Sequence, residues 1–498
     1  MVHKIPTPAG DMLYSRTSVR HALSSISLML SDILALAGAL VFANMLFLVR
    51  RNAELLQYPD IWAEAMAPNR LAILVSLVVF LVGMFYFSGL YARRRPHWDE
   101  LAIVIKMVLF TALLDAGLQY LAKLPFSRYW YFGMWLGALA AIPAMRFITK
   151  SLLLRLRLWQ RPAVIVGTGQ NAIDAASALQ SERQMGYQVV AFLNPASGAA
   201  DANNWMTVAG QPIPVLPLDL EQPQTLRQLG EGTVVIALEK QTPERLTPLI
   251  ARIQRHCHEL KVTPDLRGLP LFGARLHHFY RQELLFLDLQ NNLARAGPRL
   301  LKRIFDQITA VILMLLLLPV FAVLALLVQR DGGPIFFAHD RIGQGGSPFR
   351  CLKFRTMVPN AHARLEHHLT TDPDARKEWQ ASFKLKEDPR VTPLGKWLRR
   401  YSLDELPQLL NVLKGDMSLV GPRPIVEQEL ARYGEELEYY YEVKPGMTGL
   451  WQISGRNGLD YAERVYLDTW YAKNWSLWMD LVILLETPGA LLRKEGAY

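Results

Sequence analysis

Long apolar runs set the strongest limit on how this chain can fold, because about 20 apolar residues in a helix are enough to cross a lipid bilayer. Four such runs follow one another near the N-terminus: Ser27 to Val49, Leu71 to Leu90, Leu101 to Leu121 and Tyr129 to Phe147. The chain has 498 residues, which leaves room for soluble domains after these runs. We therefore expect a membrane protein of mixed α and α/β class, in which residues 1–150 form a four-span transmembrane bundle.

Charged residues interrupt two of the apolar runs: Asp32 lies in the first, and Lys106 and Asp115 lie in the third. An ionisable residue within a span usually faces the bundle interior and has a partner there. We therefore expect these residues to pack or pair inside the bundle. The basic residues Arg93-Arg94-Arg95, and others after the fourth run, place both ends of the bundle on the cytoplasmic side.

The overall composition agrees with a membrane region joined to soluble domains. Hydrophobic residues make up 51% of the chain, and the net charge is +10. That charge suits anionic lipid, phosphorylated small molecules or nucleic acid, and composition does not choose among them. The two cysteines, Cys257 and Cys351, predict no disulfide framework and indicate that the soluble parts face a reducing cytosol.

Residues 151–295 alternate between strand and helix patterns, which is typical of a parallel sheet. A buried strand leads through Gly167-Thr168-Gly169 into a helix, as in Rossmann-like and CoA-binding-like domains. Further strands are expected at Val189 to Leu193, at Thr233 to Leu238 and, as a linker, within Leu271 to Leu293. Nucleotide binding and a loop without a ligand both remain open. The second strand ends at Asn194, where a dinucleotide-binding domain normally has an acidic residue.

A fifth apolar run, Ile308 to Val328, differs from the first four. Pro319 lies near its middle, where it removes a backbone hydrogen bond and favours a bend. Both flanks are basic, with Lys302 and Arg303 before the run and Arg330 after it. A simple span would place one of these flanks outside. We therefore expect a re-entrant helix at about residues 303–328 that breaks at Pro319, with a fifth transmembrane helix as the alternative.

The adjacent carboxylates Asp404 and Glu405 follow two arginines, at what the pattern predicts to be a helix start. Two carboxylates among cations suit phosphoryl transfer, because one can attack phosphorus and the other can hold magnesium or take a proton. A structural alternative is a capping box, in which Ser402 caps the helix and Glu405 bonds back to it. The two interpretations are compatible, since a helix N-terminus also attracts phosphate.

Basic residues recur around this acidic pair, in loops rich in Gly and Pro and in a strand expected from Phe349 to Arg355. Each alone is more often an ordinary solvated charge. Together they indicate a site for phosphate groups, because guanidinium and ammonium groups neutralise phosphate oxygens. The candidates are Arg341, Lys353, Arg355, Arg390, Arg399, Arg400, Arg423 and Arg456.

Near the C-terminus, Trp470, Trp475 and Trp478 accompany leucines in an amphipathic stretch. We expect an interfacial helix there, with a buried core helix as the alternative. The two interpretations differ in whether the indole rings are exposed.

Five ordered motifs run through residues 296–498: Lys302-Arg303-Ile304-Phe305-Asp306, Lys353-Phe354-Arg355-Thr356-Met357, Ser402-Leu403-Asp404-Glu405-Leu406-Pro407-Gln408, Gly421-Pro422-Arg423-Pro424 and Lys444-Pro445-Gly446-Met447-Thr448-Gly449-Leu450-Trp451. In this order they resemble the bacterial sugar transferase family, the monotopic polyprenyl-phosphate phosphoglycosyl transferases. The bundle and the Rossmann-like domain resemble its large subgroup, typified by undecaprenyl-phosphate galactose-phosphate and glucose-phosphate transferases. The chain has Leu318-Pro319 where related enzymes often carry Ser-Pro. The bend is expected to survive, because the proline enforces it.

This resemblance implies a two-step reaction in O-antigen, capsule or exopolysaccharide synthesis. Asp404 would attack the β-phosphate of a UDP-hexose, release UMP and pass the phosphosugar to undecaprenyl phosphate. Glu405 would assist as a Mg²⁺ ligand beside Asp404, or as a base. The resemblance further implies a homodimer in the bacterial inner membrane, with its site on the cytoplasmic side, contacts to membrane lipids and no nucleic-acid partner. Galactose 1-phosphate is favoured over glucose 1-phosphate by resemblance to the subgroup alone.

Two functions of other classes are kept as alternatives. A non-catalytic scaffold that senses a nucleotide through its Rossmann-like domain would have no use for Asp404, Glu405 and the cations together. A transporter would need the fifth apolar run to span the membrane. The segments near Pro298 and Gly333 would then lie on opposite sides of the bilayer.

Overall fold

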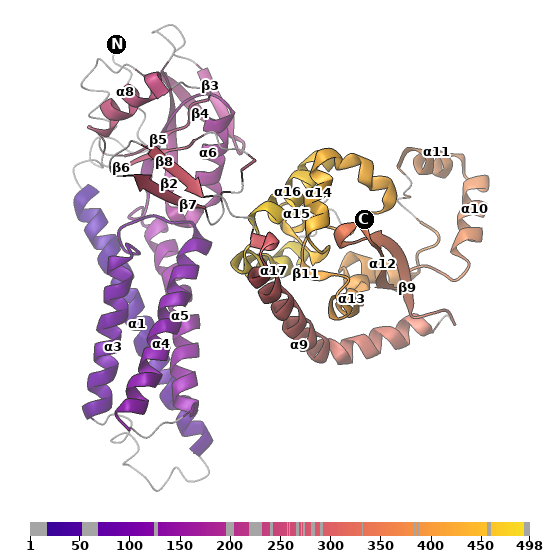
Figure 1. Cartoon of the computed structure of the whole chain (residues 1–498), viewed down its shortest axis with the longest axis horizontal. Helices are drawn as coiled ribbons and strands as arrows, with labels where there is room; N and C mark the ends of the chain where they lie inside the picture. Colours follow the sequence, from indigo (N-terminus) through magenta and orange to yellow (C-terminus); the bar gives the residue numbers. More distant parts are fainter. Residues whose placement is uncertain are drawn as a thin grey trace. The chain divides into compact units, whose positions relative to one another are not determined.

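A computed structural model describes residues 17–51, 68–123, 128–195, 204–218, 232–239, 243–255, 257, 259–264, 268–269, 271, 274–279, 284–288, 292–330, 332–382, 385, 388–455 and 460–492. The chain forms two compact units, Met1–Leu266 and Arg267–Tyr498. The first unit holds a helical bundle and a sheet, and the second holds the long helix α9 (Ala296–Gln329) (Figure 1). The acidic pair, Asp404 and Glu405, also belongs to the second unit.

The first unit begins with a helix at each of the four predicted apolar runs: α1 (Thr17–Arg51), α3 (Pro68–Phe87), α4 (His97–Leu121) and α5 (Arg128–Arg155). By length and composition, α4, α5 and the Ala22–Phe47 part of α1 can each cross a membrane, as can α9 of the second unit. The apolar part of α3, Leu71–Phe87, is shorter. Figure 1 shows the bundle helices α1, α3, α4 and α5 side by side, in indigo and purple. Their facing side chains form one buried core.

Carboxylates inside the bundle are paired, as the sequence predicts for Asp32 and Asp115. Arg146 donates from Nε and Nη2 to Asp32 at 2.7 and 2.6 Å. Asp115 accepts a hydrogen bond from Trp135 Nε1 at 2.8 Å. Lys106 differs, because its side chain is exposed on α4. The expectation of packing or pairing inside the bundle is therefore wrong for this lysine.

A six-stranded sheet in the first unit has the order β3-β4-β2-β1-β5-β6. Neighbouring strands run parallel except for β3 against β4, which confirms the expected parallel sheet. Successive residues of β1 face opposite layers, with Ile165 in the core under α6 and Val164 in the core under α8. The elements are β1 (Arg161–Val166), α6 (Gln170–Ser181), η2 (Arg183–Met185), β2 (Tyr187–Asn194), β3 (Asn204–Val208), β4 (Gln211–Pro217), β5 (Thr233–Ile236), α8 (Pro243–Gln254) and β6 (Glu259–Val262).

A carboxylate of the chain itself fills the glycine loop between β1 and α6. The backbone N–H of Asn171 donates to Glu239 Oε1 at 2.9 Å. A Cβ built on Gly169 would lie 2.6 Å from the same oxygen, so only glycine permits this approach. Glu239 therefore takes the position at the start of α6 where a bound phosphate would be expected. This arrangement favours a loop without a ligand over nucleotide binding.

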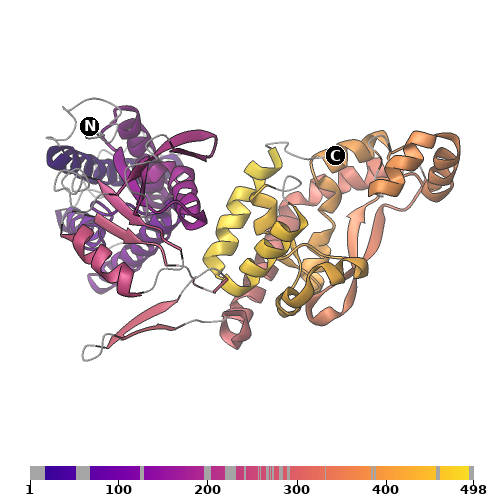
Figure 2. The same ribbon diagram turned by 90° about the horizontal axis from the view of Figure 1, so that it is seen from above.

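The second unit consists of helices and short two-stranded sheets around α9. Its first element is the hairpin of β7 and β8, which confirms the strands predicted in the linker and is drawn as an extended pink ribbon in Figure 2. The elements besides α9 are β7 (Arg275–Phe279), β8 (Leu284–Asp288), η3 (Asn292–Ala294), β9 (Phe336–Ile342), η4 (Gln344–Gly346), β10 (Pro348–Phe354), α10 (Ala361–Thr371), α11 (Pro373–Ser382), α12 (Pro393–Arg400), η5 (Leu403–Glu405), α13 (Gln408–Lys414), β11 (Ser418–Val420), η6 (Glu427–Arg432), η7 (Gly434–Glu436), α14 (Leu437–Glu442), β12 (Gly446–Thr448), α15 (Leu450–Ile453), α16 (Tyr461–Asn474) and α17 (Leu477–Leu492).

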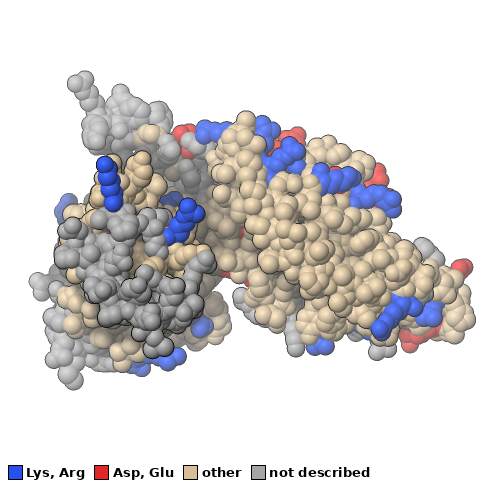
Figure 3. All heavy atoms as spheres, turned by 90° about the horizontal axis from the view of Figure 1, so that it is seen from below, with Lys and Arg blue, Asp and Glu red and all other residues tan. Residues whose placement is uncertain are grey.

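Helix α9 has 34 residues and carries Pro319 inside it. Figure 1 shows that the helix changes direction along its length. Many of its apolar side chains are exposed, among them Leu315, Leu316 and Leu326. Figure 3 shows a broad face of the second unit that is almost free of charged side chains and has lysines and arginines along its edges. Exposed apolar surface of this kind is typical of a region that contacts lipid.

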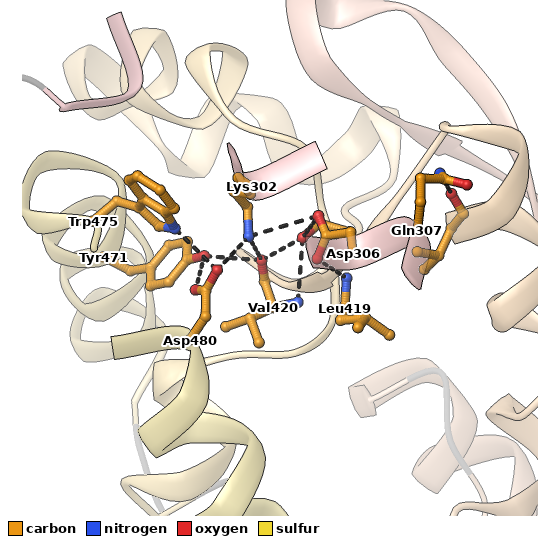
Figure 4. Close-up of polar contacts among 10 residues, drawn as sticks. Lys302, Asp306, Gln307, Leu419, Val420, Tyr471, Trp475 and Asp480 are labelled. Atoms are coloured by element: carbon orange, nitrogen blue, oxygen red, sulfur yellow. Dashed lines mark hydrogen bonds and ion pairs between the residues drawn. The ribbon is translucent and has the colours of Figure 1, made fainter. Parts of the chain in front are cut away.

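Both ends of α9 bond to the same unit. Near its start, Lys302 Nζ donates to Asp480 Oδ2 at 2.7 Å and to Val420 O at 3.1 Å (Figure 4). Near its end, the carbonyl of Val328 accepts from Arg355 Nη2 at 2.9 Å. In a straight helix these two positions would be about 40 Å apart, and the bend shortens that span. Lys302 is buried in this network, so it serves the interior of the unit and not a solvated basic flank.

The aromatic stretch near the C-terminus forms part of the core. Trp475 is 3% exposed and donates from Nε1 to Asp480 Oδ2 at 3.0 Å. Figure 4 shows Tyr471 and Trp475 beside the same carboxylate, with Lys302 on its other side. A buried carboxylate needs such donors, because burial without them is costly. Trp475 therefore fits the buried core helix, whereas Trp470 and Trp478 are half-buried, and the expected interfacial helix stays a prediction.

Candidate active site

The hairpin of β9 and β10 brings Lys353 to the candidate site. The two strands pair antiparallel, with Lys353 opposite Phe337. The next residue, Phe354, is buried, and its ring centroid lies 5.5 Å from that of Phe321 on α9. Successive residues of a strand face opposite sides. Burial of Phe354 therefore turns Lys353 to the other side of the strand, where it meets the acidic pair.

The acidic pair lies in a tight turn between two helices. A single 3₁₀ turn, η5, covers Leu403–Glu405, and α13 begins only at Gln408. Ser402 enters this turn with a φ of 53°, in the left-handed region, and its side chain makes no capping hydrogen bond. The predicted capping box is therefore wrong, because an N-cap residue normally needs extended backbone angles to present its side chain. The predicted helix start is also displaced, since Asp404 precedes the α-helix.

Asn411 fixes α13, and with it the turn, against β10. Its Nδ2 donates to the carbonyl of Arg350 at 2.8 Å, and its Oδ1 accepts from the N–H of Leu352 at 3.0 Å. The amide thus bonds to the strand backbone in both directions from a fully buried position. Sequence reasoning missed this residue. The available signal was a single asparagine within the apolar run Leu409-Leu410-Asn411-Val412-Leu413.

Lys353 faces both carboxylates. Its Nζ lies 2.6 Å from Glu405 Oε1, to which it donates a hydrogen bond, and 3.8 Å from Asp404 Oδ2. Asp404 is 8% exposed. Burial raises the pKa of Asp404, Glu405 adds to that shift, and Lys353 opposes it. Burial alone would lower the pKa of Lys353, but the two carboxylates outweigh it and raise that pKa. Asp404 is therefore a carboxylate largely shielded from water, and the charge of Lys353 stabilises its ionised form.

Arg399 and Thr356 extend the site on the side of Asp404. Arg399 Nε donates to Thr356 Oγ1 at 2.9 Å, and its charge helps to oppose the rise in the pKa of Asp404. Arg400, the next residue, is exposed, and its guanidinium carbon lies 5.9 Å from the ring centroid of Tyr401. Both arginines are exposed at the surface, but Arg399 acts on the Asp404 carboxylate, whereas Arg400 lies against Tyr401.

Two of the predicted phosphate ligands bond to the protein itself. Arg390 pairs with Asp388 through three side-chain hydrogen bonds, at 2.8, 3.0 and 2.6 Å. Arg355 donates from all three of its side-chain nitrogens to backbone carbonyls, those of Pro334, Met357 and Val328. Both arginines therefore use their side-chain donors to stabilise the fold. Arg456 lies outside the described residues.

Two glycine-containing motifs meet through their backbones. A Cβ on Gly421 would lie 2.3 Å from the carbonyl oxygen of Lys444, and the N–H of Gly446 donates to Pro422 O at 2.8 Å. The backbones touch, so neither loop tolerates a side chain at its glycine. Arg341 Nη1 donates to Pro424 O at 3.1 Å and holds the far end of the first loop. These contacts explain why widely separated motifs lie at one site.

Arg423 projects from that loop toward Trp451. Its guanidinium carbon lies 5.8 Å from the centroid of the indole ring. Burial lowers the pKa of Arg423, as do the neighbouring cations Arg464 and Arg341, whereas Glu405 acts in the opposite direction. Arg423 is therefore within electrostatic reach of the acidic pair. Arg464, which shares this neighbourhood, is a residue that sequence reasoning missed.

Asp404 and Glu405 offer the oxygen ligands that Mg²⁺ prefers. Among the residues that the structure describes, no group of three or more His, Cys, Asp and Glu side chains is arranged to hold a metal. Magnesium often binds through one or two carboxylates together with substrate phosphates. The acidic pair fits that second case. Glu405 is the more exposed of the two, with its side chain 39% exposed against 11% for Asp404, although its Oε1 also accepts from Lys353.

The chain is similar to known proteins over most of its length. The family described as "Bacterial sugar transferase" matches residues 297–494. The "Undecaprenyl-phosphate galactose phosphotransferase" of Salmonella typhimurium is 43% identical over 424 residues, which cover 85% of this chain and 87% of the relative. The "UDP-glucose:undecaprenyl-phosphate glucose-1-phosphate transferase" of Xanthomonas campestris pv. campestris is 31% identical over 466 residues, which cover 88% of this chain and 89% of the relative.

A shorter relative matches part of the chain. The "Exopolysaccharide production protein ExoY" of Rhizobium meliloti is 48% identical over 214 residues, which cover 43% of this chain and 95% of the relative. Less than half of this chain thus corresponds to nearly the whole of that protein.

Proposed function

We propose that this chain, which belongs to the bacterial sugar transferase family, transfers a hexose 1-phosphate from a UDP-sugar to undecaprenyl phosphate and releases UMP. The placement of Asp404, buried beside Lys353 and next to Glu405, carries the proposal, because it supplies a carboxylate nucleophile among cations. Galactose is the favoured sugar, since the galactose relative shares 43% identity and the glucose relative 31%. Glucose is the alternative.

In the first step, an oxygen of the Asp404 carboxylate attacks the β-phosphorus of the UDP-sugar. The bond from that phosphorus to the bridging oxygen breaks, UMP leaves with the electron pair, and the sugar phosphate stays on Asp404 as an acyl phosphate. Lys353 and Arg399 favour this step, because they stabilise the ionised carboxylate against the effect of burial. Arg423 adds positive charge where the phosphate oxygens gather.

In the second step, a phosphate oxygen of undecaprenyl phosphate attacks the phosphorus of the acyl phosphate. The bond to Asp404 breaks, and the carboxylate returns to its starting form. Burial of Asp404 supports this sequence, because limited access of water protects an acyl phosphate from hydrolysis. Glu405 assists as a base or as a magnesium ligand, and bound Mg²⁺ would neutralise charge on the phosphate groups.

The proposal places α9 in the membrane as a re-entrant helix that enters and leaves on the cytoplasmic side of the bacterial inner membrane. Its exposed apolar residues, its bend and the contacts of both its ends with one unit support this placement. Cysteine labelling near Pro298 and Gly333 in sealed vesicles tests it. Both positions should react from the cytoplasmic side, and reaction from opposite sides would replace the re-entrant helix with a transmembrane one.

The remaining regions are proposed to support this site. Residues 1–150 anchor the chain, residues 151–295 form a Rossmann-like domain, and residues 296–498 carry catalysis. Glu239 in the glycine loop supports a Rossmann-like domain that assists folding or assembly and binds no nucleotide. A homodimer is proposed from the family alone. Catalysis by a folded 296–498 fragment would support these boundaries, and loss of UDP-sugar binding in that fragment would contradict them.

The reaction is tested by measuring UMP release from a panel of UDP-sugars with the full-length protein in detergent or nanodiscs. UDP-galactose should give the highest rate when undecaprenyl phosphate is present. With the UDP-sugar alone, mass spectrometry should detect a phosphosugar adduct on the wild-type protein and none on Asp404→Asn. An adduct that persists in the variant would assign the nucleophile to another residue.

A further inference from the structure

Cationic and aromatic side chains alternate in a stack beside the candidate site. The order is Arg423, Trp451, Arg464, Tyr461 and Arg432, with guanidinium carbons 5.8, 5.0, 5.1 and 4.9 Å from the ring centroids in turn. Arg423 lies in the loop after β11, and Trp451 lies on α15. Tyr461 and Arg464 lie on α16, and Arg432 ends η6. Cation–π contacts hold the guanidinium groups in place without using their hydrogen-bond donors.

Several donors inside this stack have no hydrogen-bond partner among the residues that the structure describes. Arg464 Nε and Nη2 are buried and unbonded, as are Trp451 Nε1 and the Tyr461 hydroxyl. The contact of Arg464 Nη2 with Glu429 Oε1 is an ion pair at 3.8 Å, too long for a hydrogen bond. Buried donors in native proteins are almost always bonded to protein, water or a ligand. A group of them at one place therefore indicates a site for an acceptor.

The charge around Arg464 is also unbalanced. Three arginines, Arg341, Arg423 and Arg464, lie near two carboxyl groups. Glu429 is 3.9 Å from Arg341 and 3.8 Å from Arg464, and the buried Asp468 interacts with the charges of Arg464 and Arg423. Their side chains are largely buried, so water screens their repulsion poorly. The mutual repulsion contributes to the lowered pKa of Arg423. An arrangement that costs stability in the free protein is explained if an anion completes it.

We propose that Arg464 binds a phosphate group of a substrate together with Arg423, and so extends the site beyond the acidic pair. The planar guanidinium groups offer the forked donors that suit phosphate, and Trp451 Nε1 and the Tyr461 hydroxyl are further donors in the same place. This inference rests on the proposed function for the identity of the substrate. The phosphate belongs either to the nucleotide sugar or to the lipid acceptor, and both present the same chemistry.

The variant Arg464→Met tests the proposal, because it removes the charge and donors while keeping much of the length of the side chain. Full-length protein in nanodiscs should unfold at an unchanged or higher temperature without ligand, since a repulsive charge and two unbonded donors are lost. Binding of the phosphate ligand should weaken by about tenfold or more. Arg432→Met is the matched control, because Arg432 stacks on the same Tyr461 ring but is exposed. It should change neither quantity.

Calorimetry with UDP, and separately with a short-chain polyprenyl phosphate, identifies the source of the phosphate. Weaker binding in either titration supports the site and assigns it to that substrate. Unchanged binding of both, with a lower unfolding temperature, overturns it and makes Arg464 a purely structural member of the stack.

If Arg464→Met does not fold, Arg464→Lys keeps the charge but not the planar fork. If this variant unfolds at the same temperature as the wild type but binds the ligand more weakly, the site is supported. Unchanged binding overturns it. A wild-type protein that binds UDP yet releases no UMP from any UDP-sugar would contradict the proposed reaction while leaving this site standing.

Discussion

The bundle and the candidate site both bury charged side chains, but they balance them differently. In the bundle, Asp32 and Glu100 face Arg146 and Lys150, so this buried network holds two acids and two bases, and each of its two carboxylates accepts from a cation. Arg146 alone bonds both carboxylates, at 2.6 and 3.0 Å. Near the candidate site, the three arginines Arg341, Arg423 and Arg464 outnumber the carboxyl groups of Glu429 and Asp468, and two nitrogens of Arg464 have no bond to any residue that the structure describes.

This difference separates charges that hold a fold from charges that await a ligand. A balanced buried network leaves no capacity for a substrate, and removing one member leaves its partner buried and unpaired. An unbalanced network keeps capacity for a ligand of the missing sign, at some expense of stability. Variants in the bundle should therefore change stability more than chemistry. Variants around Asp404 should do the reverse.

Asp404→Asn should give the largest effect on chemistry. The amide cannot act as the nucleophile, so UMP release should fall by at least about 10³-fold. The unfolding temperature should stay near the wild-type value, because asparagine has the same shape and needs no charge buried. Activity is measured by UMP release and folding by thermal unfolding in the same detergent. Retention of more than a tenth of the activity would remove Asp404 from the proposed role.

Arg146→Met should break the balanced network of the bundle. Asp32 and Glu100 would lose their shared cation, and the free energy of unfolding should fall by about 3–5 kcal/mol. The UMP release rate per folded molecule should stay within about twofold of the wild type, because the variant leaves the second unit unchanged. The double variant Asp32→Asn with Arg146→Met should recover part of the lost stability. A stable single variant with lost activity would instead place this network in the reaction.

Several parts of this molecule follow from sequence pattern because local physics decides them. Apolar length predicts the bundle helices, and Pro319 predicts a change of direction in α9. Long-range contacts decide the rest. Lys302 reads as a membrane-flanking charge, yet Asp480, far along the chain, draws it into the interior. Likewise, Arg464 meets Trp451 of α15 and Glu429 of η6, and no local spacing predicts these two contacts. Its contact with Tyr461, three residues earlier on the same helix, is local.

The acidic pair shows the same division within a few residues. Adjacent carboxylates among cations predict the site, because the chemistry needs those groups. The capping box fails there, because Ser402 adopts a left-handed backbone angle that its local motif does not indicate. Arg355 and Arg390 carry the right charge, but their own neighbours take their donors. Charge type is therefore readable from sequence, whereas the partner of each charge is not.

Lys353→Met should move the pH dependence of the reaction. Burial raises the pKa of Asp404 and Lys353 opposes that rise, so removing the lysine raises the pKa further. Because the ionised form attacks, activity falls as pH drops through this pKa, and the acid limb of the kcat/KM profile should shift to higher pH by about one unit. Lys396→Met, an exposed change on α12, is the control and should leave the profile unchanged. An unmoved acid limb in Lys353→Met would separate Lys353 from Asp404.

Asp468→Asn should produce a smaller effect, on stability. Burial raises the pKa of Asp468 to about 7, while the Tyr433 hydroxyl, the Arg464 charge and the Arg423 backbone N–H oppose the rise. Since the folded pKa exceeds the ordinary value of 3.8, stability from this group is present at low pH and is lost as pH rises toward 7. The variant should match the wild type near pH 4 and unfold roughly 2–4 °C higher at pH 8. Parallel curves for the two proteins across this range would contradict it.

Ser402→Gly should give the smallest effect, and its sign distinguishes a strained turn from a capped helix. A left-handed backbone angle costs a residue with a side chain up to about 1 kcal/mol relative to glycine, so the variant relieves strain in the folded state. Glycine also gives the unfolded chain more conformational freedom, and this offsets part of the stabilisation. We therefore expect the free energy of unfolding to rise by about 0.5 kcal/mol or to stay level.

If Ser402 capped the helix, its replacement by alanine would instead lower the stability of the protein. Ser402→Ala serves as the comparison, because it keeps the Cβ strain and removes only the hydroxyl. It should match the wild type in stability, and a loss of about 1 kcal/mol would restore the capping role.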